Sequence, residues 1–294
     1  VSRRRWLFAF GGLCRGGGME GETVLVTGAA GAGVGEQVAL QFAALGALVV
    51  ALDINKQALA ELKTKAEGMG YNVMIVVCDL SDKKQIKRMA ADLKRSGVEV
   101  DVLVNNAGVA NGKYLLDASD EELERTMQVN LFAHMWLIRE FLPGMIDRDQ
   151  GHIVTISSAL GVVGMSRLAD YSATKFGAFG LTEALRFELQ KQGKAHIKTT
   201  VVCPGMINTP MYHRFGSIPM KFPIIMPLLE PSEIASRVVR CVTKRNEELV
   251  LVPRLLWAYF ALRLLPVRWF DAVMRYLGWS STFDLYDYLQ SHGE

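Results

Sequence analysis

The sequence predicts one α/β domain built on a doubly wound parallel sheet flanked by helices. Seven short runs rich in Val and Ile are almost continuously apolar, as strands buried on both faces are. Amphipathic stretches separate them, and this regular alternation favours right-handed βαβ units. No internal repeat or low-complexity linker interrupts the pattern, so a single domain is expected. The predicted strands cover residues 23–28, 47–53, 73–79, 101–108, 152–157, 197–203 and 249–253.

Between the strands, the apolar spacing is that of helices. Three of the predicted helices close on a glycine, which is the residue that most easily ends a helix. They span residues 34–46, 55–70 and 81–97, and longer helices are expected around 119–145 and 167–193.

Composition narrows the class of protein. Apolar residues make up 50% and charged residues 21% of the 294-residue chain, which is typical of a globular protein. The net charge of +3, with no basic block in the body of the chain, argues against nucleic-acid binding. Four cysteines lie far apart, and Cys78 and Cys203 end apolar runs. This use of cysteine favours a reducing compartment, so a cytoplasmic location is expected.

Three segments are expected along the chain. Residues 1–20 form a leader or anchor, residues 21–253 the dinucleotide-binding and catalytic domain, and residues 254–294 an amphipathic extension. The apolar part of the leader is too short to span a bilayer. It reads equally as an interfacial anchor, a flexible leader, or sequence upstream of a start at Met19.

The glycine-rich stretch from Thr27 to Gly35 predicts a dinucleotide site. It stands between the first strand and a helix, where small residues let the backbone approach a pyrophosphate and free N–H groups face its charge. Asp53 closes the second strand, where a carboxylate binds the adenosine ribose diol and repels a 2′-phosphate. Ile54 follows it, and no Lys or Arg stands beside the glycines. These features favour NAD over NADP, although Asp53 could instead cap the helix that begins near Asn55.

Tyr171 and Lys175 predict acid/base chemistry. Their spacing of four residues in a helical stretch places both side chains on one face. A neighbouring ammonium favours the phenolate, so we expect the pKa of Tyr171 to fall from its usual value near 10. Ser158 ends the fifth strand, at the sheet edge where ligands of open α/β sheets bind. Hydride transfer from an alcohol needs such a proton acceptor.

Other site classes find no support in the sequence. There is no G-x-S-x-G elbow, which argues against a serine hydrolase. The five histidines show no paired ligand spacing, so no metal is expected. His134 reads as a helix-face histidine rather than a base.

Together these motifs resemble the short-chain dehydrogenase/reductase superfamily, with its Rossmann-like sheet, over about residues 23–253. The matching pieces are the Thr27–Gly35 loop, CDLSD at 78–82, NNAG at 105–108, Asn130 in MQVNLF, Ser157-Ser158, YSATK at 171–175 and PGMINTP at 204–210. Stretches such as GHIVTISSALG and IKTTVVCPGMINTPM are similar to the branch of retinol and 17β-hydroxysteroid dehydrogenases.

The resemblance implies roles for individual residues. Tyr171 would be the acid/base, and Lys175 would lower its pKa and bind the nicotinamide ribose. Ser158 would orient the substrate oxygen, and Asn130 would hold a water that links Lys175 to solvent. The implied cofactor-binding residues are Thr27, Gly28, Gly31, Gly33, Val34, Gly35, Asp53, Asp79, Leu80, Asn106, Ala107, Gly108, Tyr171, Lys175, Pro204, Gly205, Ile207 and Thr209, with Asp79 at the adenine edge and Thr209 at the carboxamide.

The glycine loop departs from the family pattern T-G-x-x-x-G-x-G. Gly28, Gly33 and Gly35 imply one extra residue. Either Gly31-Ala32-Gly33 bulges to absorb it or the pyrophosphate sits slightly differently, and binding is expected to survive in both cases.

Two segments point to the substrate. Residues 206–231 are rich in Met, Pro, Ile and Phe and stand where the family has a mobile lid, although a loop packed on the core would look the same. In residues 254–279, Pro266 separates two short helical pieces with arginines beside Trp, Tyr and Leu. That pattern fits a helix in a membrane interface, a subunit interface or a wall of the substrate pocket.

The sequence therefore predicts an NAD-dependent dehydrogenase that acts on a small lipophilic secondary or allylic alcohol, of retinoid or steroid type. Reduction of a 3-oxoacyl thioester and a non-catalytic dinucleotide-sensing scaffold are the alternatives. A homodimer or homotetramer is expected, since long helices pair subunits in this family. Peripheral contact with a membrane or lipid droplet is the further expectation.

Overall fold

A computed structural model describes residues 18–214, 227–244, 249–277 and 279. Its centre is a seven-stranded parallel sheet with strand order β3-β2-β1-β4-β5-β6-β7. The order reverses beside β1, so the sheet is doubly wound and the predicted fold class is confirmed. The strands are β1 (Thr23–Thr27), β2 (Leu48–Asp53), β3 (Val73–Val77), β4 (Val102–Asn105), β5 (Gly151–Ile156), β6 (Ile197–Pro204) and β7 (Leu249–Val252).

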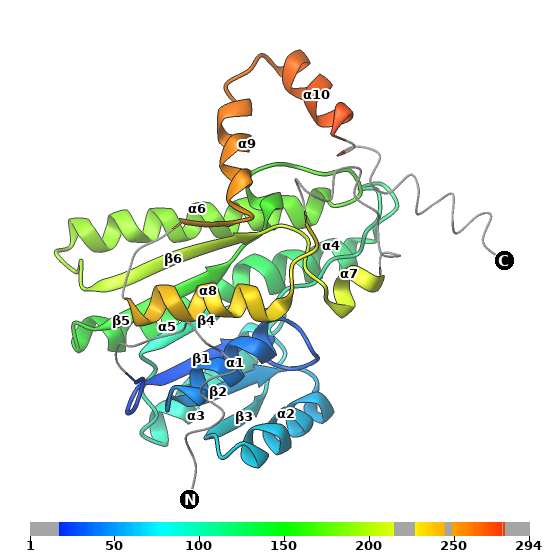
Figure 1. Cartoon of the computed structure of the whole chain (residues 1–294). Coiled ribbons are helices and arrows are strands. Elements are labelled where there is room, and N and C mark those ends of the chain that lie inside the picture. The colour runs from blue at the N-terminus through cyan, green and yellow to red at the C-terminus, as the bar shows by residue number, and fades with distance from the viewer. Residues whose placement is uncertain (1–17, 215–226, 245–248, 278, 280–294) are drawn as a thin grey trace, which may run out of the picture.

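Helices cover both faces of the sheet (Figure 1). One buried cluster joins the sheet to α1, α2 and α8, and a second joins it to α3, α5 and α6. Strands apolar on both sides are buried on both sides, as the continuous Val and Ile runs predict. The helices are α1 (Val34–Ala44), α2 (Lys56–Gly68), α3 (Lys83–Arg95), α4 (Asp120–Met127), α5 (Ala133–Asp147), α6 (Ala169–Lys191), α7 (Pro210–Arg214), α8 (Pro231–Thr243), α9 (Trp257–Leu262) and α10 (Val267–Tyr276).

The predicted helix ends are where the glycines stand. Gly46, Gly70 and Gly97 follow α1, α2 and α3, with φ of 93°, 76° and 73°. A side chain resists this left-handed conformation, which is why glycine occupies these positions.

Two predicted strands end earlier than expected. The run 101–108 forms a strand only to Asn105, because the N–H groups of Asn106 and Ala107 donate to Thr27 Oγ1. The run 73–79 ends at Val77, and Asp79 enters a turn in which its Oδ1 accepts from the Ser81 N–H. Both departures turn polar residues out of the sheet at its carboxyl edge.

The predicted helix 119–145 is three elements. A capping box at Ser119 and Glu122 starts α4, a π-helix covers Gln128–Phe132, and α5 continues to Asp147. The wider π turn sets Asn130 inward, where it is fully buried.

The chain after β7 packs on the domain at Leu256 and Tyr259 and again at Met274 and Trp279. Leu256, Tyr259, Met274 and Trp279 are buried in a third cluster beside β6 and β7. Figure 1 shows α9 leading away from the sheet and α10 turning back towards the domain. At the other end of the chain, Met19 is already buried and its N–H donates to the Leu45 carbonyl. Residues 1–17, and 215–226 of the predicted lid, lie outside the described residues.

Candidate active site

One cavity of about 520 Å³ opens at the carboxyl edge of the sheet. The ends of β1, β4, β5 and β6 converge there, so chemistry-bearing residues far apart in sequence share one space. Of the predicted residues, those that line it are Gly28, Gly31, Gly33, Val34, Gly35, Asp53, Asn106, Ala107, Gly108, Ser158, Tyr171, Lys175, Pro204, Gly205, Ile207 and Thr209.

The glycine loop absorbs its extra residue as a local bulge. Gly31 and Ala32 both adopt left-handed backbone, with φ of 88° and 57°, and Gly33 then starts α1. After the bulge, α1 packs closely against the end of β1. A side chain on Gly35 would overlap the carbonyl oxygen of Gly28. The first of the two interpretations of the extra residue therefore describes this structure.

Thr27 and Asn106 hold this loop against β4. Thr27 Oγ1 accepts from the Asn106 and Ala107 N–H groups at 2.9 and 3.0 Å. The Asn106 amide donates to the carbonyls of Thr27 and Gly28. Thr27 is fully buried and is absent from the cavity lining, and these hydrogen bonds tie it to the loop.

The residues around the loop fit a dinucleotide. No side chain caps the N-terminus of α1, which leaves its first N–H groups available to an anion. Beside Gly31 and Gly33, the space within 4 Å that a Cβ would face is open. Glycine at these positions therefore leaves room for a pyrophosphate against the backbone.

Asp53 is held at the end of β2 by two backbone groups. Its Oδ2 accepts from the Ala30 N–H at 3.2 Å and its Oδ1 from the Asn55 N–H at 2.9 Å. The cap of α2 is Asn55, whose Oδ1 accepts from Ala58, so capping does not explain Asp53. The carboxylate lines the cavity and keeps lone pairs for a diol.

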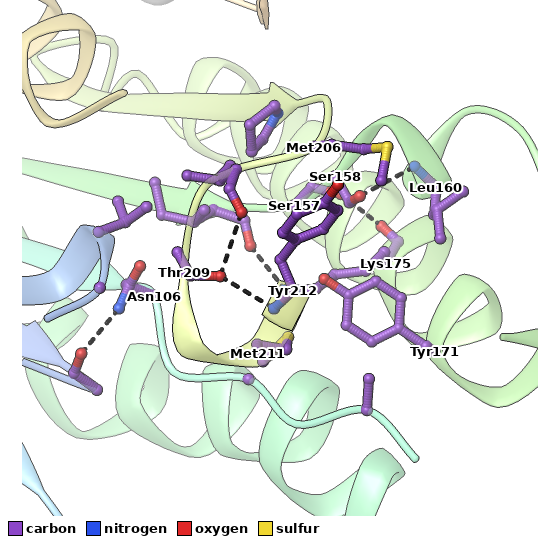
Figure 2. Close-up of a pocket in the computed structure, with 18 of the residues that line it drawn as sticks. Asn106, Ser157, Ser158, Leu160, Tyr171, Lys175, Met206, Thr209, Met211 and Tyr212 are labelled. Atoms are coloured by element: carbon purple, nitrogen blue, oxygen red, sulfur yellow. Dashed lines mark hydrogen bonds between the residues drawn. The ribbon is translucent and has the colours of Figure 1, made fainter. Parts of the chain in front are cut away.

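The predicted catalytic groups meet on the other side of the cavity (Figure 2). Tyr171 and Lys175 lie one turn apart on α6, and the Lys175 Nζ is 5.4 Å from the centre of the Tyr171 ring. Ser158 and Tyr171 line the same cavity, and the Ser158 side chain acts to lower the pKa of the Tyr171 phenol. The Lys175 ammonium donates to the Ile156 carbonyl at 2.9 Å, and the Ser157 hydroxyl donates to the Lys175 carbonyl. These bonds fix the register of α6 against β5.

The pKa of Tyr171 does not fall as predicted. Burial raises it to about 12, although the hydrogen bond with Ser158 lowers it. Burial also lowers the pKa of Lys175 to about 8. Both shifts have the same cause, since burial disfavours the charged phenolate and the charged ammonium alike.

Besides Thr27, three predicted residues (Asp79, Leu80 and Asn130) lie away from the cavity lining. The side chain of Asn130 is committed to protein groups: Oδ1 accepts from the Val109 N–H and Nδ2 donates to the Val109 carbonyl and to Thr174. It is nevertheless close to Lys175, since a Cβ on Gly108 would be 3.5 Å from both Asn130 Oδ1 and Lys175 Nζ. Asp79 is held by its turn with Ser81, and neither Asp79 nor Leu80 lines the cavity.

Several apolar residues that line the cavity were not among the predicted site residues. Met165 and Leu168 belong to the segment between Ser158 and Tyr171, so their place near the site could have been anticipated. Met206 lies within the PGMINTP motif. Trp279 carried no such signal: its indole N–H donates to the Gly164 carbonyl at 2.8 Å, and its ring packs against Tyr259.

The described residues give no support to a histidine base or to a metal site. His134 is buried, and burial lowers its pKa to about 3, so the ring is neutral. Among the described residues, no three His, Cys, Asp or Glu side chains gather as metal ligands would.

Known proteins share this arrangement. The family model for short chain dehydrogenase matches residues 22–217. Human epidermal retinol dehydrogenase 2 is 40% identical over 259 residues, covering 88% of this chain and 82% of its own. Estradiol 17-beta-dehydrogenase 11 of Macaca fascicularis is 35% identical over 87% of this chain and 83% of its own.

A solved structure agrees. A metagenomic short-chain oxidoreductase in complex with NADP superposes with a TM-score of 0.66 at 29% identity, over 79% of this chain and 97% of its own. The motifs, the sheet and these relatives agree: the chain belongs to the short-chain dehydrogenase/reductase family, as an alcohol dehydrogenase of the branch that holds the retinol and 17β-hydroxysteroid dehydrogenases.

Proposed function

We propose that this chain transfers a hydride between NAD and a lipophilic secondary or allylic alcohol, or its carbonyl counterpart, of retinoid or steroid type. One observation carries the proposal. A single cavity joins the open N-terminus of α1, the Tyr171–Ser158 pair and a wall of Met165, Leu168 and Met206. It thus offers a phosphate site, a proton donor and acceptor, and an apolar surface together.

In this proposal the chain's own groups manage the proton. The Tyr171 phenolate would take the proton of the alcohol in oxidation, and the phenol would return it in reduction, while the Ser158 hydroxyl orients the same oxygen. Lys175, 2% exposed, would bind the nicotinamide ribose and pass protons toward the Asn130 side. A bound nicotinamide would supply or accept the hydride. The positive charge of its oxidised form would favour the phenolate that burial otherwise disfavours.

The apolar wall supports a lipophilic substrate. Leu168 and Trp279 are buried, and Met165 and Met206 pack against the same cluster. Each methylene that a substrate buries there contributes about 0.8 kcal/mol. Two of the relatives carry names that include retinol or estradiol, which directs the choice of test substrates.

The test is formation of NADH from NAD⁺ with a panel of retinol, hydroxysteroids and long-chain secondary alcohols. Turnover on one class, with the matching carbonyl reduced in reverse, supports the proposal. Preferential reduction of an acetoacetyl thioester with NADPH would support the thioester reductase instead. Binding of NADH without turnover in either direction would leave the sensing scaffold as the better description.

The choice of NAD rests on Asp53. Its carboxylate lines the cavity, and Ile54 beside it offers no positive charge to a 2′-phosphate. We expect Asp53→Asn to lower the ratio of kcat/KM for NAD⁺ to that for NADP⁺ by about tenfold, since removing a nearby charge relieves Coulomb repulsion. Steady-state kinetics with both cofactors measure the ratio. An unchanged ratio would show that Asp53 does not select the cofactor.

The C-terminal helices suit a lipid surface. Leu264 is 87% exposed, Val267 73% and Trp269 68%, and all three lie where α9 and α10 meet, far from the sheet (Figure 1). Four arginines (Arg254, Arg263, Arg268 and Arg275) accompany the one acidic residue of this segment, Asp271. Exposed aromatic and aliphatic groups beside cations are typical of interfacial binding to anionic lipid. Among the described helices, none is long and apolar enough to cross a bilayer.

Introducing negative charge at the exposed residues Leu264 and Trp269 should release the protein from lipid. We expect Leu264→Glu with Trp269→Glu to lower the fraction that floats with vesicles of mixed anionic and neutral phospholipid by about tenfold, because charged groups resist transfer into the interface. Leu116→Glu is the matched control, since Leu116 is 96% exposed on another part of the surface. Equal flotation of all variants would exclude this surface.

The proposal also covers the oligomeric state of the protein and its cellular compartment. A homodimer or homotetramer through the long helices α5 and α6 is expected, and light scattering of the purified protein measures it. Cys78, Cys203 and Cys241, the cysteines among the described residues, are buried thiols, which suits a protein that faces the reducing cytoplasm.

A further inference from the structure

The extra residue of the glycine loop has a dedicated partner. Ala32 stands in left-handed backbone, which is costly for a residue with a Cβ. Its N–H donates to Glu36 Oε2 at 2.8 Å. Glu36 is the third residue of α1, the position from which a glutamate ordinarily reaches back to the N-cap N–H. Here it reaches one residue further back and holds the bulge instead.

This partner creates an electrostatic conflict. The first turn of α1 faces the cavity through Gly33, Val34 and Gly35. A carboxylate in that turn opposes the partial positive charge that attracts an anion to a helix N-terminus. Glu36 is thus useful to the backbone but unfavourable for a diphosphate in the same place.

Lys65 resolves the conflict. From the last turn of α2, its Nζ lies 2.7 Å from Glu36 Oε1, while Oε2 stays on Ala32. The Glu36 side chain is 14% exposed and that of Lys65 44%, so the carboxylate is the more shielded of the two charges. Two helices and the loop thereby meet in one three-part contact.

We propose that Glu36 and Lys65 are positioning residues for the cofactor: Glu36 fixes the conformation of the extended glycine loop, and Lys65 neutralises Glu36 so that the helix N-terminus still accepts a diphosphate. The inference rests on the dinucleotide site of the proposed function and not on its substrate. Glu36 has two separate functions in this proposal, a hydrogen-bond acceptor for Ala32 and a negative charge. Substitutions can remove one and keep the other.

The experiment measures the Kd of NADH by fluorescence at low and high salt, with thermal denaturation to verify folding. Lys65→Gln leaves the carboxylate bare and should weaken NADH binding about fivefold at low salt and less at high salt. Adding Glu36→Gln to it should restore binding, because the amide oxygen still accepts from Ala32. Lys63→Gln is the matched control, since Lys63 pairs with Glu67 on the same helix and has no contact with the loop among those described.

A second comparison tests the backbone role. Glu36→Ala should weaken NADH binding more than Glu36→Gln does, and Ala32→Gly in the Glu36→Ala background should recover part of the loss, since glycine accepts left-handed backbone readily. If Lys65→Gln binds NADH as tightly as Lys63→Gln does, neutralisation is refuted. If Glu36→Ala and Glu36→Gln bind alike, the loop role is refuted. Failure of the unaltered protein to bind NADH or NADPH would overturn the proposed function itself.

Discussion

Replacing Tyr171 by Phe is expected to lower kcat/KM for alcohol oxidation by about 10³-fold while NADH still binds. The substitution removes the hydroxyl that shares the cavity with Ser158 and leaves the ring in place. General acid/base catalysis is worth about 10²- to 10⁴-fold, so the loss should fall in this range. Steady-state rates and NADH fluorescence separate the loss of proton transfer from a loss of cofactor binding.

Tyr212→Phe is the control for this substitution. Tyr212 lines the same cavity from α7 (Figure 2), so the control removes a phenolic hydroxyl from the same space. A far smaller loss than for Tyr171→Phe is expected. Equal losses in the two variants would contradict the role of Tyr171.

The pH dependence follows from the same hydroxyl. Burial raises the pKa of Tyr171 to about 12, so the phenolate that accepts the alcohol proton is scarce at neutral pH. Below that pKa, the phenolate fraction grows tenfold for each unit of pH. The rate of oxidation should therefore rise with pH, and the rate of reduction, which uses the protonated phenol, should not.

The second large effect is expected from Lys175→Met, which should cost about 10²- to 10³-fold in kcat/KM but stabilise the fold. The pKa of Lys175 is lowered from 10.5 to about 8 because burial disfavours its charged form. That cost is fully present below pH 8 and is relieved between pH 8 and 10.5, where the unfolded lysine still binds a proton and the folded one does not.

Removing this lysine should therefore raise the melting temperature at pH 7. The bond to the Ile156 carbonyl is lost, so we expect a net gain of about 1 kcal/mol, or roughly 2–4 °C. The gain should shrink as pH rises towards 10.5. Calorimetry at pH 7 and 10 measures it, and a lower melting temperature than that of the unaltered protein at pH 7 would mean that the ammonium is well compensated.

The sequence predicted the features that depend on local spacing. Strands buried on both faces read as apolar runs, and Tyr171 and Lys175 follow from one turn of helix. Gly35 is required because α1 packs on the carbonyl of Gly28, which a strand–glycine–helix pattern implies.

What depends on burial or on distant contacts was not predictable in the same way. The raised pKa of Tyr171 reflects desolvation, which spacing does not report. Asn130 is buried in the protein interior because of a π-helical turn that no sequence motif predicts. Trp279 reaches a carbonyl 115 residues away, so its place beside the site required the folded chain.

The contact of Trp279 with Gly164 means that the cavity is built from two separate regions of the sequence. The proposed catalytic residues come from α6 and the turn after β5, whereas this part of the cavity wall comes from the segment after β7. Changes after β7 can thus alter which molecules fit without touching the residues that carry out the chemistry. Exchanging that segment between relatives should transplant substrate preference as a module, and natural diversification of this branch could proceed by the same route.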